Sequence, residues 1–424
     1  MMNVPWTKQK SLCEMTMNNL AELEAYFYEH SLSTYDRQNY DCYLKDHHFS
    51  FAIPSIHITG TNGKGSTAKY LYEIYLSAGY HVGLYQSPYL NSVLEMISID
   101  GKQITELEYL ELFNELQPDF KKYELTAFEM ETIIALTYFQ RKGINLVIIE
   151  VGMGGYIDAT NIITPELSII TSVALEHTAY LGKSVSEIAD NKAGIIKQYM
   201  PVLLGKLDEN ALFAIRQRAK QCESQIYIVD DYHNEVVGDH SMTYDYRPYK
   251  SLELSTVSEY QLKNASIAVE ATKLLQEKFP VNEEAVRQGL KTVTLPCRYE
   301  FIKKNILLDG AHNAEAMSAL ANTLEKNEHR TIHVIFASFR DKNVDSMLIS
   351  LGRISNDVVL TTFNHKRART EEEYFLYLGD YEFKEDYMSY LHELEEKYPN
   401  DLILVTGSLC FTGIVREKLL NEAK

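Results

Sequence analysis

The chain has few cysteines and no long apolar run. Its 424 residues include five widely spaced cysteines, with no CxxC pair among them: Cys13, Cys42, Cys222, Cys297 and Cys410. Scattered thiols of this kind indicate a reducing compartment and disfavour a disulfide framework or a zinc site. No stretch approaches 18 uncharged apolar residues, and residues 1–20 lack the apolar core of a signal peptide. We therefore expect a cytoplasmic protein without a membrane span.

Positive charge is also scarce. Lys and Arg together number 41 against 59 Asp and Glu, which gives a formal net charge of −18 and a pI of about 5.2. A chain with this charge repels polyanions, so we expect no binding to nucleic acid or to anionic membranes. An anionic small molecule would have to be bound by a local group of cations.

Short apolar runs alternate with longer amphipathic segments along the chain. The runs are rich in Val and Ile and span residues 53–59, 145–151, 167–175, 201–205, 225–229, 306–309, 331–337, 357–362 and 402–406. Several are continuously apolar, as parallel strands buried on both faces are. Helix-like stretches between them span residues 66–78, 128–141, 262–278 and 313–326. This alternation predicts the α/β class with doubly wound parallel sheets.

The length predicts more than one domain. The segment TLPCRYE at residues 294–300 contains a proline and interrupts the pattern after a helix-like stretch. We place a boundary there, between a P-loop-type parallel-sheet domain at 1–294 and a smaller Rossmann-like α/β domain at 295–424. The polar, turn-rich segment 232–259 predicts a small antiparallel hairpin within the first domain.

A glycine-rich loop follows the first predicted strand and opens a helix. Glycine lets backbone N–H groups curl around phosphate oxygens, and the helix N-terminus adds favourable partial charge. Lys64 would reach the β- and γ-phosphates, and Ser66 or Thr67 would bind Mg²⁺. The loop departs from a strict Walker A pattern at Ile58 and Gly65, and the alternative is a simple glycine-rich turn. We predict phosphate binding by Gly60, Thr61, Asn62, Gly63, Lys64, Gly65, Ser66 and Thr67.

Glu150 ends the apolar run LVIIE. A carboxylate there would be buried in a low dielectric at a high energetic cost unless a cation lay beside it. Mg²⁺ prefers oxygen ligands and commonly takes one or two carboxylates plus phosphate, so we predict a magnesium ligand. The alternative is a structural glutamate in a salt bridge. The Gly152–Gly155 segment lacks GxGxxG spacing, so close backbone approach to a ligand is favoured over a Rossmann fingerprint.

Three further polar positions lie near strand or helix ends. His177 follows the run at 167–175, where a metal or phosphate role competes with a structural one. Lys192 begins a mostly apolar helical stretch, and its spacing does not distinguish it from a surface lysine. Asp309 ends a strand before Gly310-Ala311-His312-Asn313. Asp309 could hold a ribose hydroxyl and His312 a phosphate, although an Asn at position 313 is also a common helix cap.

Seven segments occur in an order that resembles a known family. They are GTNGKGS, EVGMGGYIDATN, the stretch from His177 to Lys192, the pair Gln261 and Asn264, LPCRYE, DGAHN and VTGSLCFTG. From about residue 56 to the C-terminus the chain is similar to the folylpolyglutamate synthase and dihydrofolate synthase family of the Mur ligase superfamily. This resemblance implies that ATP phosphorylates a folyl carboxylate and that the amine of L-glutamate attacks the acyl phosphate. Dihydropteroate is a second candidate acceptor.

The resemblance also implies roles for individual residues. Ser66 and Glu150 would hold one Mg²⁺, and Glu150 with His177 would serve a second. Lys64, Glu150, His177 and Lys192 would be catalytic, with Lys192 carbamylated. The remaining nucleotide contacts would come from Gln261, Asn264, Arg298, Asp309 and His312, so catalysis would require the two domains to close.

Departures from the family pattern fall where acceptor recognition or linker flexibility is decided. They are Tyr89, Tyr156, Glu176, Tyr260 and Cys297, together with the segment 31–50. A ligase for another carboxylate acceptor and a nucleotide-binding scaffold without turnover are therefore alternatives. The basic cluster at 365–369 could grip an anionic tail or glutamate, or could be a solvated loop. We expect a monomer with small-molecule substrates.

Overall fold

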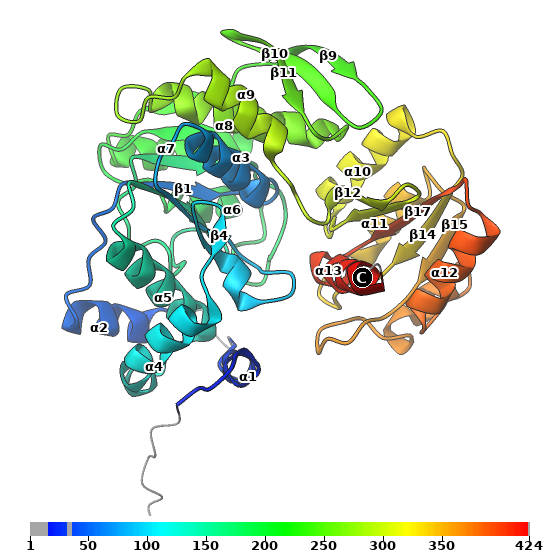
Figure 1. Cartoon of the computed structure of the whole chain (residues 1–424), viewed down its shortest axis with the longest axis horizontal. Coiled ribbons are helices and arrows are strands. Elements are labelled where there is room, and N and C mark those ends of the chain that lie inside the picture. The colour runs from blue at the N-terminus through cyan, green and yellow to red at the C-terminus, as the bar shows by residue number, and fades with distance from the viewer. Residues whose placement is uncertain (1–15, 32–35, 423–424) are drawn as a thin grey trace, which may run out of the picture.

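The computed structural model describes residues 16–31 and 36–422, which form a larger and a smaller lobe (Figure 1). The larger lobe contains an eight-stranded and a three-stranded sheet, and the smaller lobe contains a six-stranded sheet. Among the described helices, none is both long enough and apolar enough to cross a bilayer. Cys13 lies outside the described residues, and the other four cysteines are free thiols.

The large sheet confirms the α/β class. Its strand order is β4 (Lys102–Gln103), β3 (Ile97–Ile99), β2 (Val82–Tyr85), β5 (Leu146–Glu150), β1 (Ser55–Thr59), β6 (Leu167–Ile170), β7 (Val202–Leu204) and β8 (Ile226–Ile228). The six strands from β2 to β8 in this order run parallel, and β3 and β4 add a short antiparallel edge. Because β1 lies between β5 and β6, the loops that follow these three strands emerge side by side.

Helices cover both faces of this sheet (Figure 1). On one face, Ile148 packs in a core with α3 (Lys64–Ser77), α8 (Glu259–Leu274) and α9 (Glu283–Thr292). On the other, Val147 and Ile149 pack in a second core with α1 (Leu20–Glu29), α2 (Gln38–Asp46), α4 (Glu106–Lys122) and α5 (Ala127–Lys142). Near β6 and β7, a third core is formed with α6 (Val185–Ala193) and α7 (Glu209–Gln221). Successive side chains of β5 thus point to opposite cores, which explains its continuously apolar sequence.

The segment predicted as a hairpin forms the three-stranded antiparallel sheet of β9 (His233–Val237), β10 (Met242–Tyr246) and β11 (Tyr249–Leu254). The smaller lobe has the strand order β12 (Arg298–Lys303), β13 (Ile306–Asp309), β17 (Leu402–Thr406), β14 (Ile332–Phe336), β15 (Asp357–Leu360) and β16 (Glu382–Phe383). All of these strands except β12 run parallel to their neighbours. The division at residue 294 stays a prediction.

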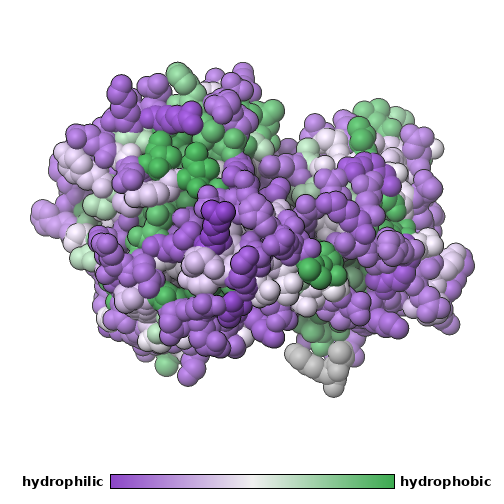
Figure 2. All heavy atoms as spheres, turned by 90° about the horizontal axis from the view of Figure 1, so that it is seen from above, coloured by the Kyte–Doolittle hydropathy of each residue, from purple (hydrophilic) through white to green (hydrophobic). Residues whose placement is uncertain are grey.

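The smaller lobe also contains α10 (Ala314–Asn327), α11 (Val344–Leu351), α12 (Tyr387–Lys397) and α13 (Leu409–Glu422). Short 3-10 helices occur at η1 (Val93–Met96) and η2 (Glu372–Tyr377). Seen from above, the outer surface is largely hydrophilic where the two lobes adjoin (Figure 2). Within the junction, Glu176 of the larger lobe lies close to His312 and Lys342 of the smaller lobe.

Helices α3 and α9 approach closely because α9 has a glycine where they cross. A Cβ on Gly289 would stand 2.5 Å from the Cα of Ile74 and 2.6 Å from its backbone nitrogen. Both atoms belong to the helix backbone, so they cannot move aside as a flexible side chain would. This contact helps to fix α3, and with it the loop that precedes α3.

Gly289→Ala should therefore destabilise the larger lobe. Overpacking costs about 1–3 kcal/mol, which exceeds the gain of about 1 kcal/mol from replacing a helical glycine by alanine. Urea unfolding followed by circular dichroism measures the change. Gly379→Ala is the control, because nothing lies within 4 Å of the added Cβ. A Gly289→Ala protein at least as stable as the parent would contradict this packing.

Candidate active site

The glycine-rich loop joins β1 to α3 and is fastened to the segment that follows β6. The N–H of Thr61 donates to the carbonyl of Ser172 at 2.9 Å, and the N–H of Asn62 donates to Ser172 Oγ at 2.8 Å. Gly63 has a φ of 86°, and a Cβ there would stand 2.3 Å from Asn264 Oδ1. The first turn of α3, which leaves backbone N–H groups without helical partners, therefore starts at a fixed place beside this loop.

Glu150 lies next to this first turn. Its carboxylate is 3 % exposed and accepts a hydrogen bond from the N–H of Ser87. The point where a Cβ on Gly65 would stand is 3.2 Å from Glu150 Oε2 and 3.1 Å from Arg298 Nη2. The phosphate loop, the acid and an arginine from β12 of the smaller lobe thus converge on one position.

The charge of Glu150 is not matched by a direct ion pair among the described residues. Burial raises the pKa of its carboxyl group, and the positive charges of Lys64 and Arg298 oppose that shift. The alternative prediction for Glu150, a structural glutamate in a salt bridge, is therefore wrong. A buried acid near two cations, with no cation bonded to it, can still accept a metal ion.

Ser87 is a site residue that the sequence reasoning passed over. It follows β2, the strand next to β5, and its Oγ is buried without a hydrogen-bond partner among the described residues. In the sequence it is marked only by its place two residues before Tyr89, one of the departures from the family pattern. Its backbone hydrogen bond to Glu150 places the unpaired Oγ of the same residue near that carboxylate.

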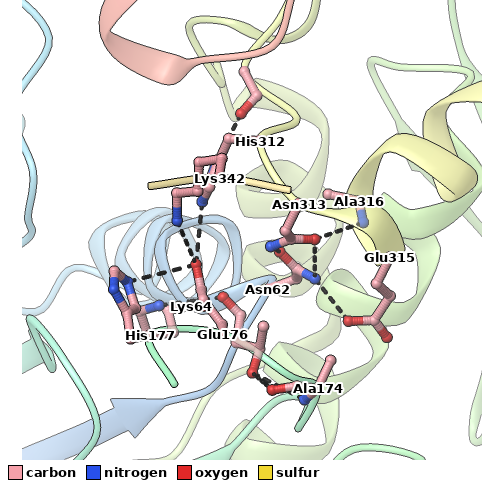
Figure 3. A network of polar contacts seen from close by, with 12 residues as sticks. Asn62, Lys64, Ala174, Glu176, His177, His312, Asn313, Glu315, Ala316 and Lys342 are labelled. Atoms are coloured by element: carbon pink, nitrogen blue, oxygen red, sulfur yellow. Dashed lines mark hydrogen bonds and ion pairs between the residues drawn. The ribbon is translucent and has the colours of Figure 1, made fainter. Parts of the chain in front are cut away.

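Glu176 connects the two lobes (Figure 3). Its Oε1 lies 3.6 Å from His177 Nε2, 3.3 Å from His312 Nε2 and 3.6 Å from Lys342 Nζ. Burial alone would favour the protonated acid, but the hydrogen bond from His312 and the charges of Lys64 and Lys342 hold the pKa of Glu176 below its usual range. Lys342 had no sequence signal, because its partner lies on the other lobe.

Lys192 is buried beside these charges, and His177 is partly buried there. Burial lowers the pKa of His177 to about 4, so its imidazole is neutral at neutral pH. Burial and the nearby Lys64 lower the pKa of Lys192 to about 7. Lys192 is 2 % exposed, so the alternative of an ordinary surface lysine is wrong. The ammonium of Lys64 donates to the carbonyl of Gly60 at 2.8 Å. Its positive charge acts to lower the pKa values of Glu150, Glu176 and Lys192.

The other predicted nucleotide contacts lie on both sides of the lobe junction. Asn264 on α8 touches the glycine loop and donates to Gln261 Oε1 at 3.0 Å. Asp309 accepts hydrogen bonds from the Tyr260 hydroxyl and the N–H groups of Tyr299 and Ala311. Burial raises the pKa of Asp309.

The predicted alternative for Asn313 is confirmed, because it caps α10 by accepting from the N–H of Ala316. Its amide also donates to Asn62 Oδ1 at 2.9 Å across the junction (Figure 3). Asn62 in turn donates to Glu315 Oε2 at 2.7 Å. The phosphate loop is thus tied directly to the first turn of a helix in the smaller lobe.

An apolar cavity of about 280 Å³ opens beside Glu150. Its walls come from the segments after β2 and β5, from the first turns of α5, and from Asp36 and Met96. Tyr89, Phe128 and Met153 are among its apolar lining residues. Ser87 and Gly152 belong to both the cavity wall and the surroundings of Glu150, so a ligand in the cavity would lie near the buried acid.

The basic cluster at 365–369 is largely engaged within the protein. Arg367 forms an ion pair with Asp341 at 2.9 Å, and Arg369 donates to the carbonyls of Arg340, Lys342 and Glu373. Lys366 lies over the ring of Tyr28 on the larger lobe at 3.9 Å. Because both arginines already have partners within the protein, these contacts favour a loop over a cluster that grips an anionic tail or glutamate.

Comparisons with known proteins agree with this arrangement. Residues 58–272 match the Mur ligase middle domain, and residues 297–409 match the Mur ligase glutamate ligase domain. A Bacillus subtilis dihydrofolate synthase/folylpolyglutamate synthase is 31% identical over 389 residues, which is 87% of this chain and 90% of that protein. The chain belongs to the folylpolyglutamate synthase and dihydrofolate synthase family of Mur ligases.

Solved structures of family members share the fold. A Mycobacterium tuberculosis folylpolyglutamate synthase complexed with ADP has a TM-score of 0.87 at 26% identity and covers 94% of this chain and 98% of that one. An Escherichia coli FolC in complex with DHPP and ADP has a TM-score of 0.85 at 26% identity, covering 96% and 99%. The fold predicted from the family resemblance is confirmed along nearly the whole chain.

Glu176→Gln should weaken the junction in a pH-dependent way. Because the pKa of Glu176 lies below its ordinary value of 4.5 in the folded protein, its contribution to stability is complete above that pH. The contribution is lost as the pH falls through the folded pKa. Calorimetry should show a lower Tm for the variant at pH 7 and pH 5.5, by an amount equivalent to about 3 kcal/mol, and a smaller difference at pH 3.5.

Glu259→Gln is the matched control, because Glu259 pairs with Lys326 across the same junction but both side chains are exposed. Its loss should change stability by at most about 0.5 kcal/mol at every pH. Equal effects of the two substitutions at pH 7 would show that Glu176 is no more than another surface acid.

Proposed function

We propose that this protein is an ATP-dependent ligase that joins L-glutamate to a folate through an acyl phosphate. The observation that carries the proposal is the convergence of the phosphate loop, Glu150 and Arg298 on one position beside an apolar cavity. An amide forms from a carboxylate only after activation, because hydroxide is a poor leaving group. A nucleotide site next to an acceptor cavity provides for that activation.

The nucleotide would lie across the lobe junction. Lys64 and the first-turn amides of α3 bind its phosphates, and Arg298 and His312 approach them from the smaller lobe. Gln261, Asn264 and Asp309 surround the remainder of the nucleotide. Since the ligands come from both lobes, bound ATP holds the junction closed while the acyl phosphate forms.

The residues present fit a magnesium ion at this position. Glu150 supplies a buried carboxylate without an ion-pair partner, and Ser87 Oγ is a buried oxygen without a hydrogen-bond partner among the described residues. Ser66 on α3 completes a set of hard oxygen ligands. The ion supplies charge neutralisation on the transferring phosphoryl group.

A second ion is a separate expectation that involves Glu150, His177 and Lys192. Within the described ranges, no three His, Cys, Asp or Glu side chains gather closely enough to hold a metal. Carbamylation of Lys192 would add the missing carboxylate. The pKa of the Lys192 side chain is about 7, so much of its amine is neutral at neutral pH. The neutral amine attacks CO₂ and releases one proton.

The cavity beside Glu150 is proposed to hold the ring system of the acceptor, with its carboxylate directed to the nucleotide. Phe128 and Tyr89 offer aromatic surface to a flat heterocycle. The E. coli relative was solved with DHPP, which keeps dihydropteroate as a second candidate acceptor.

The acceptor assay decides between the candidate functions. Purified protein with ATP, Mg²⁺ and L-glutamate should release phosphate when tetrahydrofolate is added, and Glu150→Gln should abolish this turnover while still binding ATP. Release with dihydropteroate would add the second reaction. Activity on a different acid alone would assign another acceptor, and ATP binding without turnover on any acceptor would mean a scaffold.

Lys192→Ala tests the carbamate. The variant should lose about a hundredfold in turnover, as expected for removal of one electrostatic contributor, and acetate or formate should restore part of it. Lys197→Ala is the control, because Lys197 is partly buried, with a pKa lowered by burial to about 8, and donates to the carbonyl of Asn161. Turnover of the control should not respond to acetate. A folded Lys192→Ala protein without rescue would contradict the carbamate.

A further inference from the structure

Four carboxylic acids line the mainly apolar cavity: Asp36, Glu129, Glu131 and Asp158. Three of them accept hydrogen bonds from the chain itself. Glu129 accepts from the N–H and the hydroxyl of Thr126, the N-cap residue of α5. Asp158 accepts from the N–H groups of Met153 and Thr160, and Asp36 accepts from the N–H of Gln38. These three acids are structural parts of the cavity wall.

Glu131 differs from the other three. It is 8 % exposed, and among the described residues it has neither a hydrogen-bond nor an ion-pair partner. It lies one helical turn beyond Phe128 on α5, so both side chains reach the cavity from the same helix face. A buried acid that its own protein leaves unpaired is costly, and a ligand in the cavity would supply the partner.

The surroundings of Glu131 decide its charge. Desolvation raises the pKa of its carboxyl group to about 8, so the group is mostly neutral at pH 7. Among the described residues, the hydroxyls of Tyr85, Tyr89 and Tyr109 interact electrostatically with Glu131. Burial raises the pKa values of these hydroxyls too. All three are neutral near pH 7. A neutral carboxyl offers one O–H donor and one carbonyl acceptor side by side.

We propose that Glu131 determines acceptor specificity by pairing with the amidine-type edge of a heterocycle, where a ring nitrogen adjoins an exocyclic amino group. The proposal rests on the proposed function, since a 2-amino-4-oxopteridine ring carries this edge at N1 and the 2-amino group. The O–H of Glu131 donates to the ring nitrogen, and its carbonyl accepts from the amino group. Phe128, three residues earlier on the same helix, contacts the ring face.

Two acceptors and two variants test this pairing. Turnover is measured with tetrahydrofolate and with its 2-desamino analogue, for the parent protein, Glu131→Leu and Glu131→Gln. The parent should prefer tetrahydrofolate by about tenfold or more in kcat/KM, as expected for a paired group left without its partner. Glu131→Leu should lose this preference through a raised KM for tetrahydrofolate, with the KM values for ATP and L-glutamate unchanged. Glu131→Gln keeps one donor and one acceptor and should retain most of the preference.

Stability separates recognition from a structural role. Replacing a buried, unpaired acid by leucine should leave Tm unchanged or raise it, whereas loss of a structural contact would lower it. Glu111→Leu removes an exposed acid on α4 and is the control, with unchanged preference and unchanged KM values. If Glu131→Leu keeps the preference, or Glu131→Gln loses as much as Glu131→Leu, the pairing is wrong. A parent protein that turns over tetrahydrofolate and its analogue equally also rejects it, whereas a parent without any folate-dependent turnover rejects the proposed function.

Discussion

The burial of Glu150 at the end of β5 is the constraint around which the rest of the site is arranged. A carboxylate in this position needs positive charge nearby, yet no cation bonds to it directly among the described residues. Lys64 and Arg298 act on it from two lobes, and the first turn of α3 adds its unpaired N–H groups. The site is therefore prepared for an ion that brings anionic phosphate with it. Close packing of α3 against α9 holds the turn in that place.

Charged residues of the site also join the two lobes. Glu176 has its closest contacts with His312 and Lys342 of the smaller lobe, and Lys64 lies near enough to influence both Glu150 and Glu176. One lysine thus takes part in nucleotide binding and in the junction. Closure of the lobes and binding of phosphate are consequently coupled through a shared set of charges, as ligands drawn from two domains require.

The sequence was most informative where strands end. Apolar runs located the strands, and polar residues at their carboxyl ends located Glu150 and Asp309, because parallel strands present these ends on one edge. His177 lies farther along, because β6 ends at Ile170. β2 was missed because Gly83, which lets Phe139 and Ile144 pack against the strand, breaks its apolar run. The antiparallel β12 was missed because its residues follow a proline and include charged ones.

Other site residues carry no local signal. Lys342 meets Glu176 only because two domains come together, and a single sequence does not show which distant charges pair. Glu131 stands in an ordinary helical pattern, and only the cavity beside α5 distinguishes it from a surface acid. The role of Ser87 depends on an unpaired buried oxygen, which is a property of packing. Local chemistry at strand ends could be predicted, whereas contacts between lobes and the burial of an acid on a helix could not.

A structure of the protein with Mn²⁺ and a non-hydrolysable ATP analogue tests the central claim most directly, since anomalous scattering locates the ion independently of the protein atoms. We predict one ion at about 2.0–2.2 Å from both a Glu150 oxygen and the phosphate chain, with the phosphates lying along the loop at 60–67. An ion bound away from Glu150, or a nucleotide whose phosphates leave the loop empty, would contradict the account.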